Sequence, residues 1–157
     1  MNKAKFDWQF SNPYLKDIRV KAEDTDKLGH TNNVRYLEWL ESISWQHIEA
    51  LGCGWDLTEQ LGKAMAIVRT EIDYINASYE NEALCLATWI TSSDMKLQSS
   101  RHFQLIRLSD QKVILKAKMN FVCISLKSGK PAKMSKEIIE AHELGMQQSS
   151  VGTSGDQ

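Results

Sequence analysis

A dense polar motif, residues 23–36, stands directly before an apolar pattern of helical spacing. It combines carboxylates, a glycine, a histidine and two asparagines, namely Glu23, Asp24, Asp26, Gly29, His30, Asn32 and Asn33. A helix N-terminus carries unpaired backbone N–H groups and partial positive charge, so it can polarise a carbonyl oxygen placed against it. A carboxylate beside it can attack that carbonyl or activate water. The chemistry that this arrangement suits is acyl transfer.

The periodicity of the chain predicts the elements that hold this motif. Residues 15–22 alternate between apolar and polar side chains, which is typical of a strand with one buried face. Apolar residues then recur at helical spacing over residues 33–51, and two glycines, Gly52 and Gly54, provide a stop signal. Trp39 and Trp45 lie off the main apolar stripe, so we expect a sheet or a partner to wrap this helix on more than one side.

The second half of the chain is dominated by strand patterns. After a short connecting segment, residues 55–61, four segments are rich in Ile, Val, Leu, Thr and aromatic residues: 64–75, 83–92, 97–108 and 112–125. Short polar turns separate them, so we expect four successive strands in an antiparallel meander. Ser135 can cap a short terminal helix over residues 135–144. The predicted class is therefore α+β, without an internal repeat.

Length, charge and cysteine content restrict the class of protein. The 157 residues fit one domain, which we place at residues 1–146, and the small, polar residues 147–157 predict a disordered tail. A net charge of −1 gives no basic field for nucleic acid, and no segment reaches the ~20 apolar residues of a membrane span. The three cysteines, Cys53, Cys85 and Cys123, lack metal-ligand spacing and predict free packing thiols. These features favour a cytoplasmic protein.

Three segments together resemble one known family. Asp24-Thr25-Asp26 followed by residues 29–37, Gly-His-Thr-Asn-Asn-Val-Arg-Tyr-Leu, resembles the signature of the 4-hydroxybenzoyl-CoA thioesterase-like branch of the hot-dog superfamily. Residues 71–74 and 121–131 resemble the corresponding family segments in order and spacing. The resemblance implies a long central helix wrapped by a five-stranded antiparallel β-sheet, a homodimer or homotetramer, and active sites at the subunit interface. It also implies hydrolysis of an acyl-CoA or acyl-ACP thioester without a metal or redox cofactor.

The resemblance also implies roles for individual residues. Asp26 falls where many family members carry the catalytic carboxylate, which acts as general base or nucleophile. The amides near Gly29, His30 and Thr31 would polarise the thioester carbonyl, Asn33 would face it, and Ser78 would orient water or substrate across the interface. From the residues alone, an aspartate here would cap a turn, and this remains our interpretation for Asp24. His30 fits substrate contact or a turn role equally, and helix capping is the main role expected for Asn32 and Asn33.

The chain departs from the plant-type acyl-ACP thioesterase pattern, although His30 matches its histidine. Leu28 stands where that pattern has an asparagine, and Ala77 and Ser78 stand near its second carboxylate. This favours a mechanism centred on Asp26 alone. Acyl-CoA hydrolysis is the leading hypothesis, while acyl-ACP hydrolysis and non-catalytic binding of acyl thioesters stay open, as does the acyl group itself.

Other reactive side chains carry no comparable signal. His47, His102 and His142 are isolated in the sequence, and each is interpreted as a satisfied or solvated histidine. No further His or Cys completes a metal site with the motif. CoA phosphates call for basic residues at a pocket mouth, but solvated surface charge is the better interpretation of each of the available ones, Arg69, Arg101, Lys127, Lys130 and Lys133.

Overall fold

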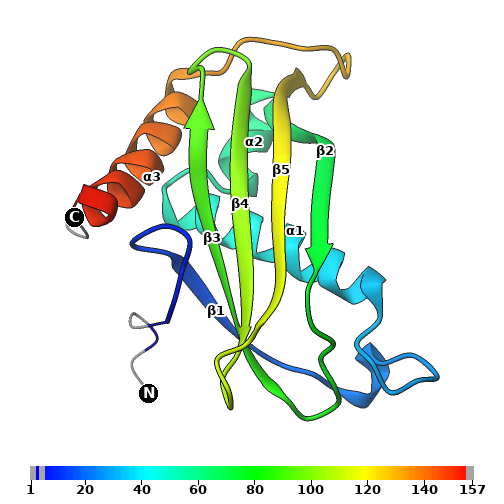
Figure 1. The fold of residues 1–157 in the computed structure, drawn as a ribbon. Coiled ribbons are helices and arrows are strands. Elements are labelled where there is room, and N and C mark those ends of the chain that lie inside the picture. The colour runs from blue at the N-terminus through cyan, green and yellow to red at the C-terminus, as the bar shows by residue number, and fades with distance from the viewer. Residues whose placement is uncertain (1–2, 4–5, 155–157) are drawn as a thin grey trace.

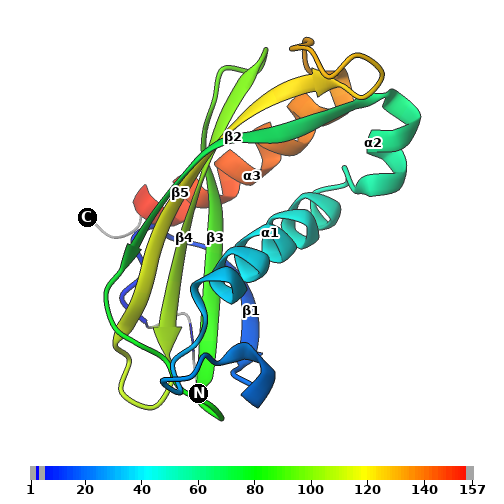
Figure 2. The ribbon, with the colours of Figure 1, turned by 90° about the vertical axis from the view of Figure 1, so that its right-hand side faces the viewer.

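The computed structural model describes residue 3 and residues 6–154, with backbone alone for 150–154. Its elements in chain order are β1 (Tyr14–Arg19), a 3-10 turn (Ala22–Asp24), α1 (Asn33–Ala50), α2 (Trp55–Leu61), β2 (Lys63–Tyr74), β3 (Ala83–Ser93), β4 (Gln98–Arg107), β5 (Val113–Ser125) and α3 (Lys136–Ser154). Figure 1 shows the sheet nearly face-on, and Figure 2 shows that it curves around α1. The predicted five-stranded antiparallel sheet around a long helix is confirmed.

The order of strands differs from the predicted meander. The sheet runs β1-β3-β4-β5-β2, so β3, β4 and β5 form a meander but β2 pairs with β5 and not with β3. After β2 the chain crosses the end of the sheet: Ile75 N–H donates to Ile114 O on β5, and Asn81 N–H donates to Val20 O after β1. The sequence pattern of a strand predicts that the strand forms but does not predict which strand it pairs with. The crossover leaves β2 as an edge strand.

The main core lies between α1 and the concave face of the sheet. Tyr36, Leu40 and Ile43 on α1 are buried in one cluster with Leu84, Leu86, Phe103 and Leu105 on β3 and β4. Burial of each large apolar side chain contributes about 1.5–3 kcal/mol. The opposite face of α1 is not covered within one chain, since Val34, Leu37 and Trp45 are exposed. The three cysteines are free, as predicted, and all three are buried.

Two helices differ from the sequence analysis. Residues 55–61, expected as a connecting segment, form α2, which ends where Gly62 adopts a left-handed conformation (φ 70°) that glycine tolerates. The terminal helix α3 extends past Leu144 to Ser154, so residues 147–154 of the expected tail carry helical backbone, and 155–157 lie outside the described residues. Asn12 Nδ2 donates to Gln148 O at 2.8 Å and ties this end of α3 to the body of the protein. The domain boundary at residue 146 stays a prediction.

The third helix covers part of one sheet edge. β1 pairs with Ala83–Thr88 of β3 only, and α3 lies along the remaining part of β3 (Figure 1). Ser93 Oγ and His142 Nδ1 are 3.2 Å apart at this contact. Within the part of the chain that the structure describes, no helix has both the length and the apolar character needed to cross a membrane.

Candidate active site

The polar motif folds into a tight loop in front of α1. The Asp26 carboxylate accepts hydrogen bonds from the backbone N–H groups of Leu28 (2.8 Å) and His30 (3.2 Å), and Asp26 N–H donates to His30 O at 2.8 Å. Gly29 allows the reversal with φ 79°, a conformation that other residues rarely adopt. Asp26 itself is exposed in the single chain. The structure therefore presents one carboxylate, in a fixed orientation, at the entrance to the helix.

Asp24 and Asn32 serve the local backbone. The buried Asp24 carboxylate accepts from Lys21 N–H at 2.9 Å and lies 3.5 Å from Arg35 Nε. Asn32 is the N-cap of α1, because its side chain accepts from Val34 N–H at 3.1 Å. Asn33 is the exposed first residue of the helix and makes no cap, so the capping role expected for both asparagines holds for Asn32 alone.

A buried hydroxyl cluster anchors the loop to the crossover after β2. The hydroxyl of Ser78 lies 2.6 Å from Thr31 Oγ1 and 2.7 Å from Tyr36 Oη, and Thr31 N–H donates to Ser78 O at 2.8 Å. Ser78 has 0% exposure and Thr31 4%. The structure thus brings Ser78 against the motif with its hydroxyl enclosed by protein, and the expected role of orienting water or substrate across an interface stays a prediction. Next to this cluster, the ring of His30 packs edge-on against Tyr79 with centroids 5.1 Å apart.

The amides expected to polarise a carbonyl are engaged inside the loop. Gly29 N–H donates to Asp26 O, His30 N–H to the Asp26 carboxylate and Thr31 N–H to Ser78 O. All three N–H groups therefore already have acceptors within the chain. Their expected role toward a thioester carbonyl stays a prediction. The N–H of Asn33, at the first position of α1, is a terminal donor with no acceptor in its own helix.

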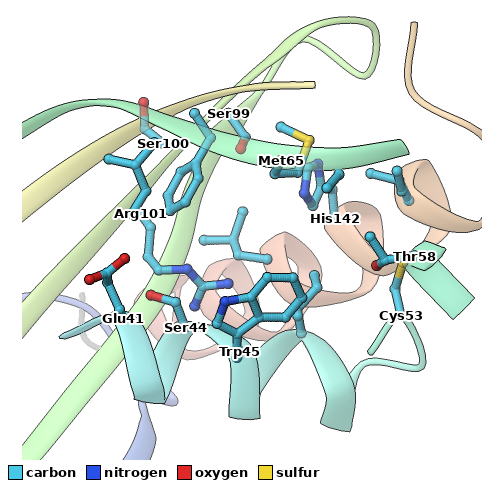
Figure 3. Close-up of a pocket in the computed structure, with 16 residues that line it drawn as sticks. Glu41, Ser44, Trp45, Cys53, Thr58, Met65, Ser99, Ser100, Arg101 and His142 are labelled. Carbon is cyan, nitrogen blue, oxygen red and sulfur yellow. The ribbon is translucent and has the colours of Figure 1, made fainter. Parts of the chain in front are cut away.

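A separate cavity of about 410 Å³ lies between the sheet, α2, α3 and the C-terminal half of α1 (Figure 3). Its walls are mostly apolar and include Ile48, Met65, Ile67, Ile90, Phe121 and Ile138. Its polar lining residues are Glu41, Ser44, Thr58, Ser99, Ser100, Arg101 and His142. Glu41 lies two turns beyond Asn33 on α1, or about 12 Å along the helix axis. A ligand that reaches both the motif and the cavity must therefore be elongated.

Arg101 is the residue that sequence reasoning placed wrongly. It was expected as solvated surface charge, but it is 5% exposed in the middle of β4 and points into the cavity (Figure 3). Burial lowers its pKa to about 9. Arg101 shares a strand face with Phe103 and Leu105, both in the core, and this alternation was the available signal.

Two of the isolated histidines are buried close to this arginine. Arg101 Nη1 donates to His47 Nδ1 at 2.7 Å, and the His47 ring stacks on Tyr14 at a centroid distance of 4.8 Å. Burial and the positive charge of Arg101 lower the pKa of His47 to about 3, and the same two causes lower the pKa of His142 to about 4. Both rings are therefore neutral at pH 7. The interpretation of His47 as a satisfied histidine is confirmed.

Comparison with known proteins gives the family. The chain matches the model of the thioesterase-like superfamily over residues 20–142. It is 29% identical over 128 residues to the long-chain acyl-CoA thioesterase FadM of Escherichia coli, which covers 80% of this chain and 94% of FadM. It is 26% identical over 128 residues to the putative acyl-CoA thioesterase YneP of Bacillus subtilis, covering 81% of this chain and 91% of that relative.

A solved structure supports the fold independently. The DHNA-CoA thioesterase of Staphylococcus aureus superposes with a TM-score of 0.78 at 18% identity, covering 91% of this chain and 95% of that one. The resemblance seen in the sequence is confirmed at the level of family and fold. With its matched span, its wrapped central helix and its Asp26 loop, the chain belongs to the thioesterase-like superfamily and has the hot-dog fold.

Proposed function

We propose that this thioesterase hydrolyses acyl-CoA to a free acid and CoA, with Asp26 as general base or nucleophile. The observation that carries the proposal is the Asp26 carboxylate, held by two backbone N–H groups at the entrance to α1. The two curated relatives, each named as an acyl-CoA thioesterase or a putative one, align over 128 residues and support CoA as the carrier.

The mechanism follows from the charges around that carboxylate. Asp26 attacks the thioester carbonyl or removes a proton from the attacking water, and the carbonyl oxygen gains negative charge. The N-terminal end of α1 stabilises this charge, with the Asn33 N–H as the donor that we assign in place of the engaged loop amides. The C–S bond then breaks, and the leaving thiolate takes up a proton and departs as the CoA thiol. With Asp26 as base, the attacking water ends in the free acid; with Asp26 as nucleophile, a water then hydrolyses the acyl–Asp26 anhydride and releases the acid and the carboxylate. His30, beside the carboxylate, contacts the substrate in this proposal.

We also propose that the active unit is a homodimer, or a tetramer built from it, that pairs through β2. Pairing through an edge strand satisfies its free N–H and C=O groups. The apolar side chains exposed on β2 include Val68 (61%) and Tyr74 (49%), and Leu28 beside the catalytic loop is 77% exposed. A second copy covering these residues would remove water from around Asp26, which strengthens its interaction with developing charge.

The test is thiol release from acyl-CoAs of increasing length, plus benzoyl-CoA and phenylacetyl-CoA, with matched acyl-ACP substrates. Asp26→Asn keeps the acceptor oxygen for Leu28 and His30 but removes the base or nucleophile, so we expect a loss of about 100-fold or more in kcat with an unchanged melting temperature. Glu23→Gln removes a charge from an exposed position in the 3-10 turn just before this loop and is the matched control.

The possible outcomes separate the hypotheses. Loss of activity in Asp26→Asn but not in Glu23→Gln supports the mechanism. An equal loss in both variants would mean that the activity depends on local negative charge and not on the Asp26 carboxylate itself. Hydrolysis of acyl-ACP but not of acyl-CoA would show that the carrier is ACP and not CoA. If the folded protein hydrolyses neither substrate, the remaining hypothesis is non-catalytic binding of acyl thioesters.

A further inference from the structure

The cavity holds a buried positive charge that the described protein residues do not neutralise. Arg101 is 5% exposed, and Figure 3 shows its guanidinium group extending from β4 toward Ser44 and Trp45 on α1. Among the described residues, no carboxylate lies within salt-bridge distance of it. Glu41 lines the same cavity, but it is exposed and forms no salt bridge with Arg101. A charge in such a place is strongly unfavourable unless something pairs with it.

The hydrogen bonds of Arg101 leave part of its donor fork unused. Nη1 donates to His47 Nδ1 at 2.7 Å and to Thr88 Oγ1 at 3.2 Å. A guanidinium group has five N–H donors, and the Nε and Nη2 atoms form no hydrogen bond within the described residues. His47 accepts as a neutral ring, so it orients Arg101 without cancelling its charge. The remaining donors suit a two-oxygen anion, which Arg binds in bidentate fashion.

The surroundings of the arginine restrict the kind of anion. The cavity volume of about 410 Å³ lies in the range of small-molecule sites, and most of the wall is aliphatic or aromatic. Arg101 is the one cation among the described lining residues, so a phosphate carries more negative charge than this wall can neutralise. A carboxylate at the end of an apolar chain matches both the single cation and the apolar wall.

We propose that Arg101 binds the carboxylate of an apolar-chain ligand in this cavity, and that the preferred substrates are acyl thioesters whose far end carries a carboxylate. The substrate part rests on the proposed thioesterase function, whereas the carboxylate site does not. The distance along α1 between the motif and the cavity fits a ligand with reacting groups at one end and an anion at the other. A free fatty acid carries the same chemistry and is the second source that the test must separate.

The first arm of the test measures binding without catalysis. Calorimetry compares dodecanoate with methyl dodecanoate for wild type, Arg101→Met and Arg101→Lys. A charge-assisted hydrogen bond corresponds to about tenfold or more in affinity, so we expect wild type to prefer the acid by at least that factor and Arg101→Met to lose the preference. Arg101→Lys keeps the charge but not the fork and should retain part of it. Arg19→Met, which removes an exposed arginine on β1, should bind like wild type.

The second arm measures substrate choice. It compares kcat/KM for dodecanedioyl-CoA and dodecanoyl-CoA, and we expect a preference of about tenfold or more for the diacid thioester that disappears in Arg101→Met. Preference in both arms supports the full proposal. Acid binding through Arg101 without the kinetic preference identifies the free acid as the ligand and overturns the substrate class. No dependence on Arg101 in the binding arm overturns the site, whether or not the protein hydrolyses thioesters.

A folding control keeps the test decisive. Because Arg101 is buried without a counter-ion, its removal relieves an unfavourable charge, and the melting temperature of ligand-free Arg101→Met should equal or exceed that of wild type. If Arg101→Met has a clearly lower melting temperature, the second variant carries the test, and Arg101→Lys should prefer the acid less strongly than wild type does. A wild-type preference for the acid in the folded fraction of Arg101→Met would assign Arg101 to structure and overturn the proposal.

Discussion

Acidification from pH 6 to pH 5 should destabilise the folded chain by about 2 kcal/mol, because buried histidines stay neutral only in the folded state. The pKa of His47 is lowered to about 3 and that of His142 to about 4, both from an ordinary value of 6.5. The folded pKa lies below the unfolded value, so the unfolded chain binds more protons in this range. The contribution of the two histidines to the free energy of unfolding is fully present above pH 6.5. It is lost as the pH falls from 6.5 toward the folded pKa values, about 4 for His142 and about 3 for His47.

The magnitude follows from proton linkage. Each proton bound only by the unfolded state changes the free energy of unfolding by about 1.4 kcal/mol per pH unit. Two histidines that are largely protonated in the unfolded chain between pH 6 and pH 5 therefore lower the free energy of unfolding by about 2 kcal/mol. His102, whose pKa is also lowered by burial, adds in the same direction. Asp94 and Asp110 have pKa values lowered from 3.8, so they titrate below pH 5 and do not contribute between pH 6 and pH 5.

The assay is urea unfolding at pH 7, 6 and 5 and at constant protein concentration, for wild type, His47→Gln, His142→Gln and the double variant. Each single substitution removes one of the two main titrating groups, so the slope of unfolding free energy against pH should fall markedly, and the double variant should keep only the smaller contribution of His102. A wild-type stability that does not change between pH 6 and pH 5, or a double variant that keeps the wild-type slope, would refute the reasoning.

Two further predictions concern the loop anchor and the sheet edge. Ser78→Ala leaves the hydroxyls of Thr31 and Tyr36 without their shared partner, so the free energy of unfolding should fall by about 1–3 kcal/mol, and urea unfolding that shows no loss would contradict the anchoring role. Val68→Lys places a charge on the exposed apolar face of β2, so light scattering should show a shift toward monomer together with reduced turnover. An unchanged oligomer would place the interface elsewhere.

Local patterns predicted the elements well because each depends on neighbouring residues. The span of α1 was predicted to within one residue, since its apolar repeat begins after a cap residue and stops at glycines. The partner of β2 was not predictable from periodicity, because pairing depends on the crossover that follows the strand. The seven-residue helix α2 was missed for a related reason, as its two glycine boundaries resemble those of a loop.

The site was predictable in its residues and not in their contacts. The motif predicted Asp26, Gly29 and Asn33 around the start of the helix, and the structure has Asp26 and Gly29 in one hydrogen-bonded loop and Asn33 as the first residue of α1. Which amides remain available depends on how the turn closes, and that is a property of three-dimensional geometry. Arg101 was misjudged because charge normally indicates exposure, and only its alternation with Phe103 and Leu105 indicated otherwise.

The position of α3 limits how many copies of the chain can join through their sheets. Strand addition at both edges would build an open filament, since each new copy would present a fresh edge. Here α3 covers the part of β3 that β1 leaves unpaired, and the outer strand β1 is six residues long and carries charges such as Lys16 and Asp17. Within the described part of the chain, β2 is the one long edge strand that no helix or strand covers, and its exposed residues include Val68 and Tyr74. When two copies pair through β2, neither has this edge left for a third copy. The fold thus favours closed, finite assemblies over polymers.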